Sequence, residues 1–64
     1  MSYRIEYSGK PDRTVRTREE LIVQLRNTEA GTVLDIRKLY KSGVSDSVME
    51  TYKKYIGEGG TDDT

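Results

Sequence analysis

Residues 32–40, which read TVLDIRKLY, admit two secondary structures that lead to different folds. In a strand, alternate side chains form one apolar face, made of Thr32, Leu34, Ile36 and Tyr40. In a helix, Val33, Ile36 and Tyr40 would align on one face instead. The β-branched content of the segment and Gly31 directly before it favour the strand. We therefore predict a strand over 33–39 that pairs with the first strand of the chain.

The segment before it, residues 1–17, has the pattern of a β-hairpin. Its first apolar residues alternate with charged ones, as in a strand with one buried face: Tyr3, Ile5 and Tyr7. Residues 9–12 read GKPD and form a turn cluster, because proline and aspartate suit the central positions of a type I turn. Residues 13–17 are again alternating and rich in β-branched side chains, so they are predicted to be the second strand.

The register of this hairpin is predicted from cross-strand chemistry. Pairing Tyr7 with Val15 makes an aromatic–β-branched pair on the core face and places Glu6 opposite Arg16 outside. A shift by two residues would set Arg4 against Arg16, and these like charges repel. A shift by one residue would mismatch the two faces. We therefore predict the register in which Tyr7 lies opposite Val15.

Helices are predicted on either side of the 33–39 strand. Thr17 and Glu20 form a capping box, which starts a helix whose apolar face holds Leu21, Ile22 and Leu25. After the strand, residues 41–43 form a turn and Ser45 is the expected N-cap of a second helix, with Val44 and Met49 as a hydrophobic staple. The apolar positions of the second helix recur at helical spacing: Val48, Met49, Tyr52, Tyr55 and Ile56.

The predicted fold class is therefore α+β, with the element order β-β-α-β-α. We expect one domain over residues 1–57, with a three-stranded antiparallel sheet in the order 2-1-3 and both helices on one face. The opposite face would show charged residues to solvent, namely Arg4, Glu6, Arg16, Asp35 and Arg37. Residues 58–64 are acidic, rich in glycine and without a large apolar side chain, so a disordered tail is expected there.

Composition argues against catalysis. The chain has no histidine and no cysteine, so it lacks the commonest general base, the best nucleophile and the usual zinc ligands. Its acids lie mostly in predicted caps and turns, and the glycine-rich residues 57–60 follow a helix instead of opening one. We expect no enzyme activity, no cofactor and no metal. The longest apolar run, residues 21–23, is too short to span a membrane, and a cytoplasmic protein is expected.

Two nucleic-acid interpretations stay open as alternatives. If residues 32–40 were helical, the C-terminal half would be helix, turn, helix, and residues 43–48 resemble the turn of helix-turn-helix repressors. Alternatively, Arg4, Arg16 and Arg37 could line a basic sheet face. Residues 1–57 hold all 11 basic and 8 of the 11 acidic residues, so their net charge is only +3. A stronger basic patch is usual in nucleic-acid binders.

The aromatic set favours a binding protein instead. Five tyrosines occur without phenylalanine or tryptophan, and each hydroxyl needs a partner or water, which places such rings at the border of a core. Tyrosine is also enriched at protein–protein contacts. We expect a small binding or regulatory module with a protein partner, and a homodimer is one way to widen its thin stability margin. Accessory proteins of phages and mobile elements have this size and charge. The candidate partner-binding residues are Tyr40, Tyr52, Tyr55, Arg16, Arg37, Lys38 and Lys41.

Deletion of residues 58–64 is expected to leave the thermal midpoint nearly unchanged, because this segment has no large apolar side chain to pack. Circular-dichroism melts of the full and truncated chains test the expectation. A midpoint lowered by several degrees would show that the segment docks on the basic remainder of the chain.

Overall fold

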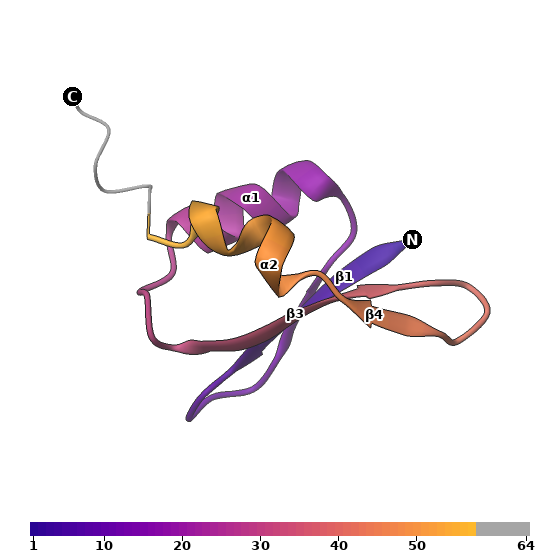
Figure 1. Cartoon of the computed structure of the whole chain (residues 1–64), viewed down its shortest axis with the longest axis horizontal. Helices are drawn as coiled ribbons and strands as arrows, with labels where there is room; N and C mark the ends of the chain where they lie inside the picture. The colour runs from indigo at the N-terminus through magenta and orange to yellow at the C-terminus, as the bar shows by residue number, and fades with distance from the viewer. Residues whose placement is uncertain (58–64) are drawn as a thin grey trace.

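A computed structural model describes residues 1–57 and shows a four-stranded antiparallel sheet in the order β2-β1-β3-β4. Figure 1 shows α1 and α2 side by side over one face of this sheet. The elements are β1 (Ser2–Tyr7), β2 (Arg13–Val15), α1 (Arg18–Arg26), β3 (Val33–Leu39), β4 (Ser45–Ser47), α2 (Met49–Tyr52) and the 3-10 helix η1 (Lys53–Tyr55). The α+β class is confirmed. The tail predicted over 58–64 lies outside the described residues.

The central prediction, a strand over 33–39, is confirmed. β3 runs antiparallel to β1, with Ile36 directly opposite Ile5, and both of these side chains are fully buried. β-branched residues pack well on such a half-covered sheet, which agrees with the preference read from the sequence. The helix that the helix-turn-helix alternative required over 32–40 is therefore not formed.

One side chain of β3 departs from the predicted face. Leu34 was expected to share the core face with Ile36, yet it is 64% exposed. The pairing explains the difference: Asp35 lies opposite Glu6, but Tyr7 lies opposite Val33, so the register shifts by one residue at Leu34. The extra residue of such a bulge has no partner on the opposite strand. Its side chain therefore does not point to the face that regular alternation along the strand would give it.

The prediction of three strands is wrong, because residues 45–47 form β4 instead of the first turn of a helix. Backbone bonds from the Tyr40 amide to the Val44 carbonyl and from the Gly43 amide to the Tyr40 carbonyl close a tight hairpin after β3. Gly43 has a φ of +92°, which only glycine adopts without strain. Ser45 is thus not an N-cap, and the hairpin satisfies backbone groups that would otherwise remain unpaired at the edge of β3.

The second helix is consequently shorter than predicted. α2 begins at Met49 and continues into η1, so the helical segment ends at Tyr55. The expected staple between Val44 and Met49 is absent, since Val44 lies in the β3–β4 hairpin and is 56% exposed. The remaining apolar positions keep their role: Tyr52 is buried, and Val48, Met49, Tyr55 and Ile56 pack partly buried against the core.

The predicted hairpin register is also wrong. Val15 lies opposite Tyr3 instead of Tyr7, and Thr14 lies opposite Arg4. The shift amounts to four residues, so it preserves the aromatic–β-branched pair and the two faces of the sheet, because side-chain orientation repeats every two residues. The ladder between β1 and β2 stops at Ile5, which leaves a longer connection than the sequence pattern indicated.

The first helix starts as predicted. The Glu20 amide donates to the Thr17 hydroxyl at 3.1 Å, and the Glu20 carboxylate accepts from the backbone amide of Arg16 at 2.9 Å. Thr17 thus caps the helix as predicted, while the Glu20 carboxylate bonds the residue before the cap instead of the cap itself. The helix directs Leu21 and Leu25 at the sheet, where both are fully buried. The buried cluster consists of Tyr3, Ile5, Tyr7, Val15, Leu21, Leu25, Ile36 and Tyr52. Within residues 1–57, no helix has the length and apolar character that crossing a membrane requires.

Two leucines give a matched test of this core. Leu25→Ala should lower the free energy of unfolding by about 2–5 kcal/mol, because the side chain is fully buried and the change leaves a cavity. Leu34→Ala should change it by no more than about 0.5 kcal/mol, because the bulged side chain faces solvent. Urea unfolding measures both. Equal losses for the two variants would contradict the assignment of Leu34 to a bulge.

Candidate functional site

Three tyrosine rings from separate elements meet at one end of the core. Tyr3 comes from β1, Tyr52 from α2 and Tyr55 from η1. The rings of Tyr3 and Tyr52 pack edge to face with centroids 5.9 Å apart, and those of Tyr52 and Tyr55 are tilted by 38° at 6.2 Å. Both distances lie in the range that favours aromatic pairs. The three rings therefore form one continuous aromatic contact.

Local structure explains why these rings meet. Tyr3 occupies the core face of β1, directly opposite Lys38 of β3. Tyr52 and Tyr55 are three residues apart in a helical segment and so lie on the same side of it. Tyr52 is buried and Tyr55 is half-buried, which places the group at the border between the core and solvent.

A cation lies over one of these rings, and a second cation lies over Tyr40, which follows β3. The Arg18 guanidinium carbon is 5.7 Å from the centre of the Tyr52 ring, and the Lys38 Nζ is 5.5 Å from the centre of the Tyr40 ring. Positive groups within about 6 Å of an aromatic face are attracted to it. We call this group the tyrosine surface and define it as Tyr3, Arg18, Lys38, Tyr40, Tyr52 and Tyr55.

The hydroxyl groups of the tyrosine surface affect one another electrostatically. Burial raises the pKa of Tyr3 above its ordinary value, and the neighbouring Tyr52 hydroxyl raises it further. The charges of Arg18 and Tyr40 act on the same phenol, in opposite directions. Tyr52 also raises the pKa of the Arg18 guanidinium.

The tyrosine surface brings together four of the residues predicted to bind a partner: Lys38, Tyr40, Tyr52 and Tyr55. Of these, Tyr52 is mostly a core residue, since its side chain is 7% exposed. Lys41 lies in the exposed turn of the β3–β4 hairpin, close in sequence to Tyr40. Figure 1 shows this hairpin extending beyond the two helices, so its end is open to solvent.

Arg37, another predicted binding residue, is held within the opposite face of the sheet. Its guanidinium donates from Nη1 to the Asp35 carboxylate at 3.2 Å, and from Nε and Nη2 to the hydroxyl and carbonyl oxygens of Ser45 at 3.0 and 3.1 Å. Ser47 donates to the other Asp35 oxygen at 2.7 Å, and this bond is the main cause that lowers the pKa of Asp35. Arg37 therefore has little capacity left for a partner.

The same face contains a second pair of opposite charges, between Arg4 and Glu6 at 3.1 Å. The Arg4 guanidinium also approaches Asp12, at 3.9 Å. Positive charge on this face is thus largely neutralised by neighbouring carboxylates.

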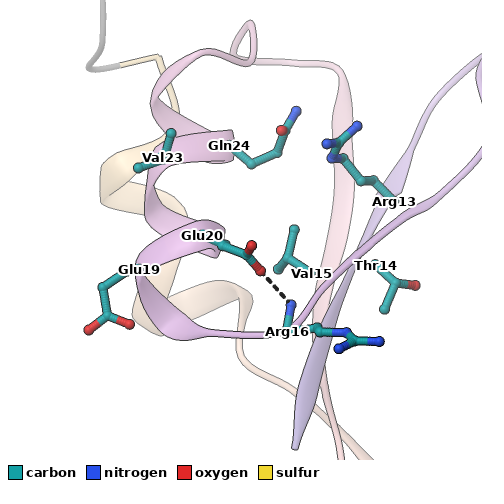
Figure 2. A pocket seen from close by; sticks show the side chains of 8 residues that line it. All are labelled: Arg13, Thr14, Val15, Arg16, Glu19, Glu20, Val23 and Gln24. Carbon is teal, nitrogen blue, oxygen red and sulfur yellow. Dashed lines mark hydrogen bonds between the residues drawn. The ribbon is translucent and has the colours of Figure 1, made fainter.

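Arg16, the last predicted residue, lies away from the other six, beside a groove between β2 and α1. Figure 2 shows this groove, whose volume is about 550 Å³. It is lined by Arg13, Thr14, Val15, Arg16, Glu19, Glu20, Val23 and Gln24. The side chains of Arg13 and Arg16 form no ion pair within residues 1–57.

Sequence reasoning missed Arg18 and assigned Tyr3 to the core alone. Arg18 begins α1, and the pattern around it indicates only a helix start. Its place over Tyr52 depends on how α1 and α2 pack side by side, which no local pattern records. For Tyr3, the strand alternation correctly indicated the core face but not the position at its border.

Comparison with known proteins assigns no family: no protein-family model, no curated protein and no solved structure matches this chain. Among residues 1–57, no cluster of three or more acidic side chains could hold a metal ion. The candidate site must therefore be judged from its own geometry.

The raised pKa of Tyr3 predicts a specific loss of stability in alkali. The folded chain favours the protonated phenol, so the associated stabilisation is complete below the ordinary tyrosine pKa of about 10 and is lost as the pH rises through the higher folded-state value. Urea unfolding between pH 8 and pH 12 should therefore show a steeper decline for the parent chain than for Tyr3→Phe. Parallel declines would contradict the prediction.

Proposed function

We propose that this chain is a small non-enzymatic binding module that acts through protein–protein contact in the cytoplasm, and that the tyrosine surface receives the partner. The observation that carries the proposal is the contact of the Tyr3, Tyr52 and Tyr55 rings at the border of the core, with Arg18 over the Tyr52 ring. A second cation–ring pair, Lys38 with Tyr40, lies at the end of the neighbouring strand β3. Tyrosine and arginine are enriched among the residues that dominate binding energy at interfaces, because they combine apolar area with a polar end.

The charge of the tyrosine surface favours an acidic partner segment. Arg18 and Lys38 belong to it, and the Lys54 Nζ lies 5.4 Å from the centre of the Tyr55 ring. Within residues 1–57, none of these three cations forms an ion pair. Carboxylates of a partner could therefore pair with them without displacing an internal ion pair, and such complementary charge speeds association and sets specificity.

The nucleic-acid alternative has weaker support. Arg4 and Arg37 of the open sheet face are paired with the carboxylates of Glu6 and Asp35. The tyrosines that could stack on bases lie on the helix-covered side, as Tyr3 and Tyr52 show. Accessory proteins of phages and mobile elements remain the setting that we propose by analogy of size and charge.

Affinity capture with matched variants tests the proposed surface. Immobilised chain is exposed to a lysate of its native host, and bound proteins are quantified by mass spectrometry. A true partner should bind the parent chain and fall about tenfold with Tyr40→Ala or Lys38→Glu, since residues that dominate an interface contribute more than about 1.4 kcal/mol each. Lys10→Glu is the control, because it makes the same charge change outside the tyrosine surface.

Two results would contradict the proposal. The first is that every captured protein binds the Tyr40→Ala and Lys38→Glu variants as well as the parent. The second is tight binding to DNA of random sequence with a steep dependence on salt, which is the signature of phosphate contacts and would favour the nucleic-acid alternative.

A further inference from the structure

The sheet has two edge strands, β2 and β4, because the strand order is β2-β1-β3-β4. An edge strand presents unpaired backbone amide and carbonyl groups that can accept another strand. β2 also borders the groove of about 550 Å³ beside α1. Figure 2 shows Val15 directed from β2 toward α1, while Thr14 points to the other side of the strand.

The side chains along β2 alternate between the two faces. Val15 lies opposite Tyr3 and is buried, whereas Thr14 lies opposite Arg4 of the open face. Above the groove, α1 carries Val23, an aliphatic side chain that is 58% exposed. An edge strand, an apolar residue left in solvent and two arginines that form no ion pair within residues 1–57 therefore occur in one place.

We propose that a second copy of this chain adds to β2, so that the two β2 strands pair antiparallel about a two-fold axis at Thr14. Closed two-fold pairs are the commonest assemblies of identical chains, and they require a surface that complements itself. The β2 segment meets this requirement. Centring the axis on Thr14 places Asp12 opposite Arg16 of the partner subunit, and by symmetry the same ion pair forms twice.

The remaining pairs of this register are also favourable. Thr14 lies opposite Thr14 of the partner subunit, and threonine pairs are stabilising across strands. Arg13 lies opposite Val15 of the partner subunit on the helix-covered face. No pair of residues in this register therefore sets two like charges opposite each other. The result is a continuous sheet through both subunits.

The other edge does not complement itself in this way. β4 spans Ser45–Ser47, and a two-fold axis at its centre sets Asp46 opposite Asp46 of the partner subunit. Like charges directly opposite each other destabilise a strand pair. Pairing of two copies through β4 is therefore disfavoured, whereas pairing through β2 is favoured.

The position of α1 is also compatible with a two-fold axis at Thr14. A two-fold axis perpendicular to the sheet keeps both α1 helices on one side, where they would face each other across the β2 strands. Packed helices approach to about 8–10 Å, which would bring the exposed Val23 side chains toward the interface. The β3–β4 hairpin with Lys38 and Tyr40 lies at the opposite edge and stays open, so the inference does not depend on the proposed function.

Disulfide trapping provides a direct test, because the chain contains no cysteine. Opposed residues of antiparallel strands have Cα atoms about 4.5–5.5 Å apart, within the span that a disulfide accepts. Under mild oxidation, Thr14→Cys should yield mostly covalent dimer on a non-reducing gel. Ser47→Cys on β4 is the matched control: it keeps Asp46, whose charge opposes pairing there, and should stay mostly monomeric. Sedimentation equilibrium of the unmodified chain should give a mass approaching twice 7.3 kDa at high concentration.

A charge exchange tests the register independently of folding. Arg16→Asp should weaken the dimer about tenfold, because both ion pairs become pairs of like charge. Adding Asp12→Arg in the same chain restores opposite charges and should restore association. The proposal is overturned if the unmodified chain sediments as a monomer at millimolar concentration, or if Thr14→Cys forms no more covalent dimer than Ser47→Cys.

Discussion

The pairing of Ile5 with Ile36 beneath α1 is the contact on which the rest of this structure depends. These isoleucines lie opposite each other in the two central strands, and with Leu21 and Leu25 they are the largest fully buried side chains among residues 1–57. Burying each such side chain contributes about 1.5–3 kcal/mol, so a chain this small can lose few of them and remain folded.

A core this small also explains where the polar chemistry lies. Tyrosines complete the apolar cluster, and because each hydroxyl needs a polar neighbour, the rings sit at the border of the core. Cations such as Arg18 and Lys38 pack over these rings, whereas Arg37 on the open face is bound to Asp35. The same shortage of apolar area leaves β2 as an uncovered edge, where a second copy would bury further surface and stabilise the fold by mass action.

Local patterns were sufficient for the features that depend on neighbouring residues. The alternation of apolar residues in β1 indicated its buried face, and β-branched content correctly favoured a strand over 33–39. The capping box of Thr17 and Glu20 placed the start of α1. For the candidate site, the sequence offered Tyr40, Tyr52, Tyr55 and Lys38 as binding candidates from their residue types, but it did not indicate that the Tyr52 and Tyr55 rings meet Tyr3.

Other features depended on partners distant in the sequence, and only the folded chain settled them. Side-chain alternation has a period of two, so it set the faces of the first hairpin but could not distinguish Tyr3 from Tyr7 as the neighbour of Val15. Ser45 has the local pattern of a helix cap, yet it pairs with Leu39 of β3 as part of β4. Hydrogen bonds to a neighbouring strand satisfy more backbone groups than a single helix cap does, which favours the strand. Sequence determined which side chains could be buried together, and tertiary packing decided which of them meet, because those contacts join segments that no local pattern relates.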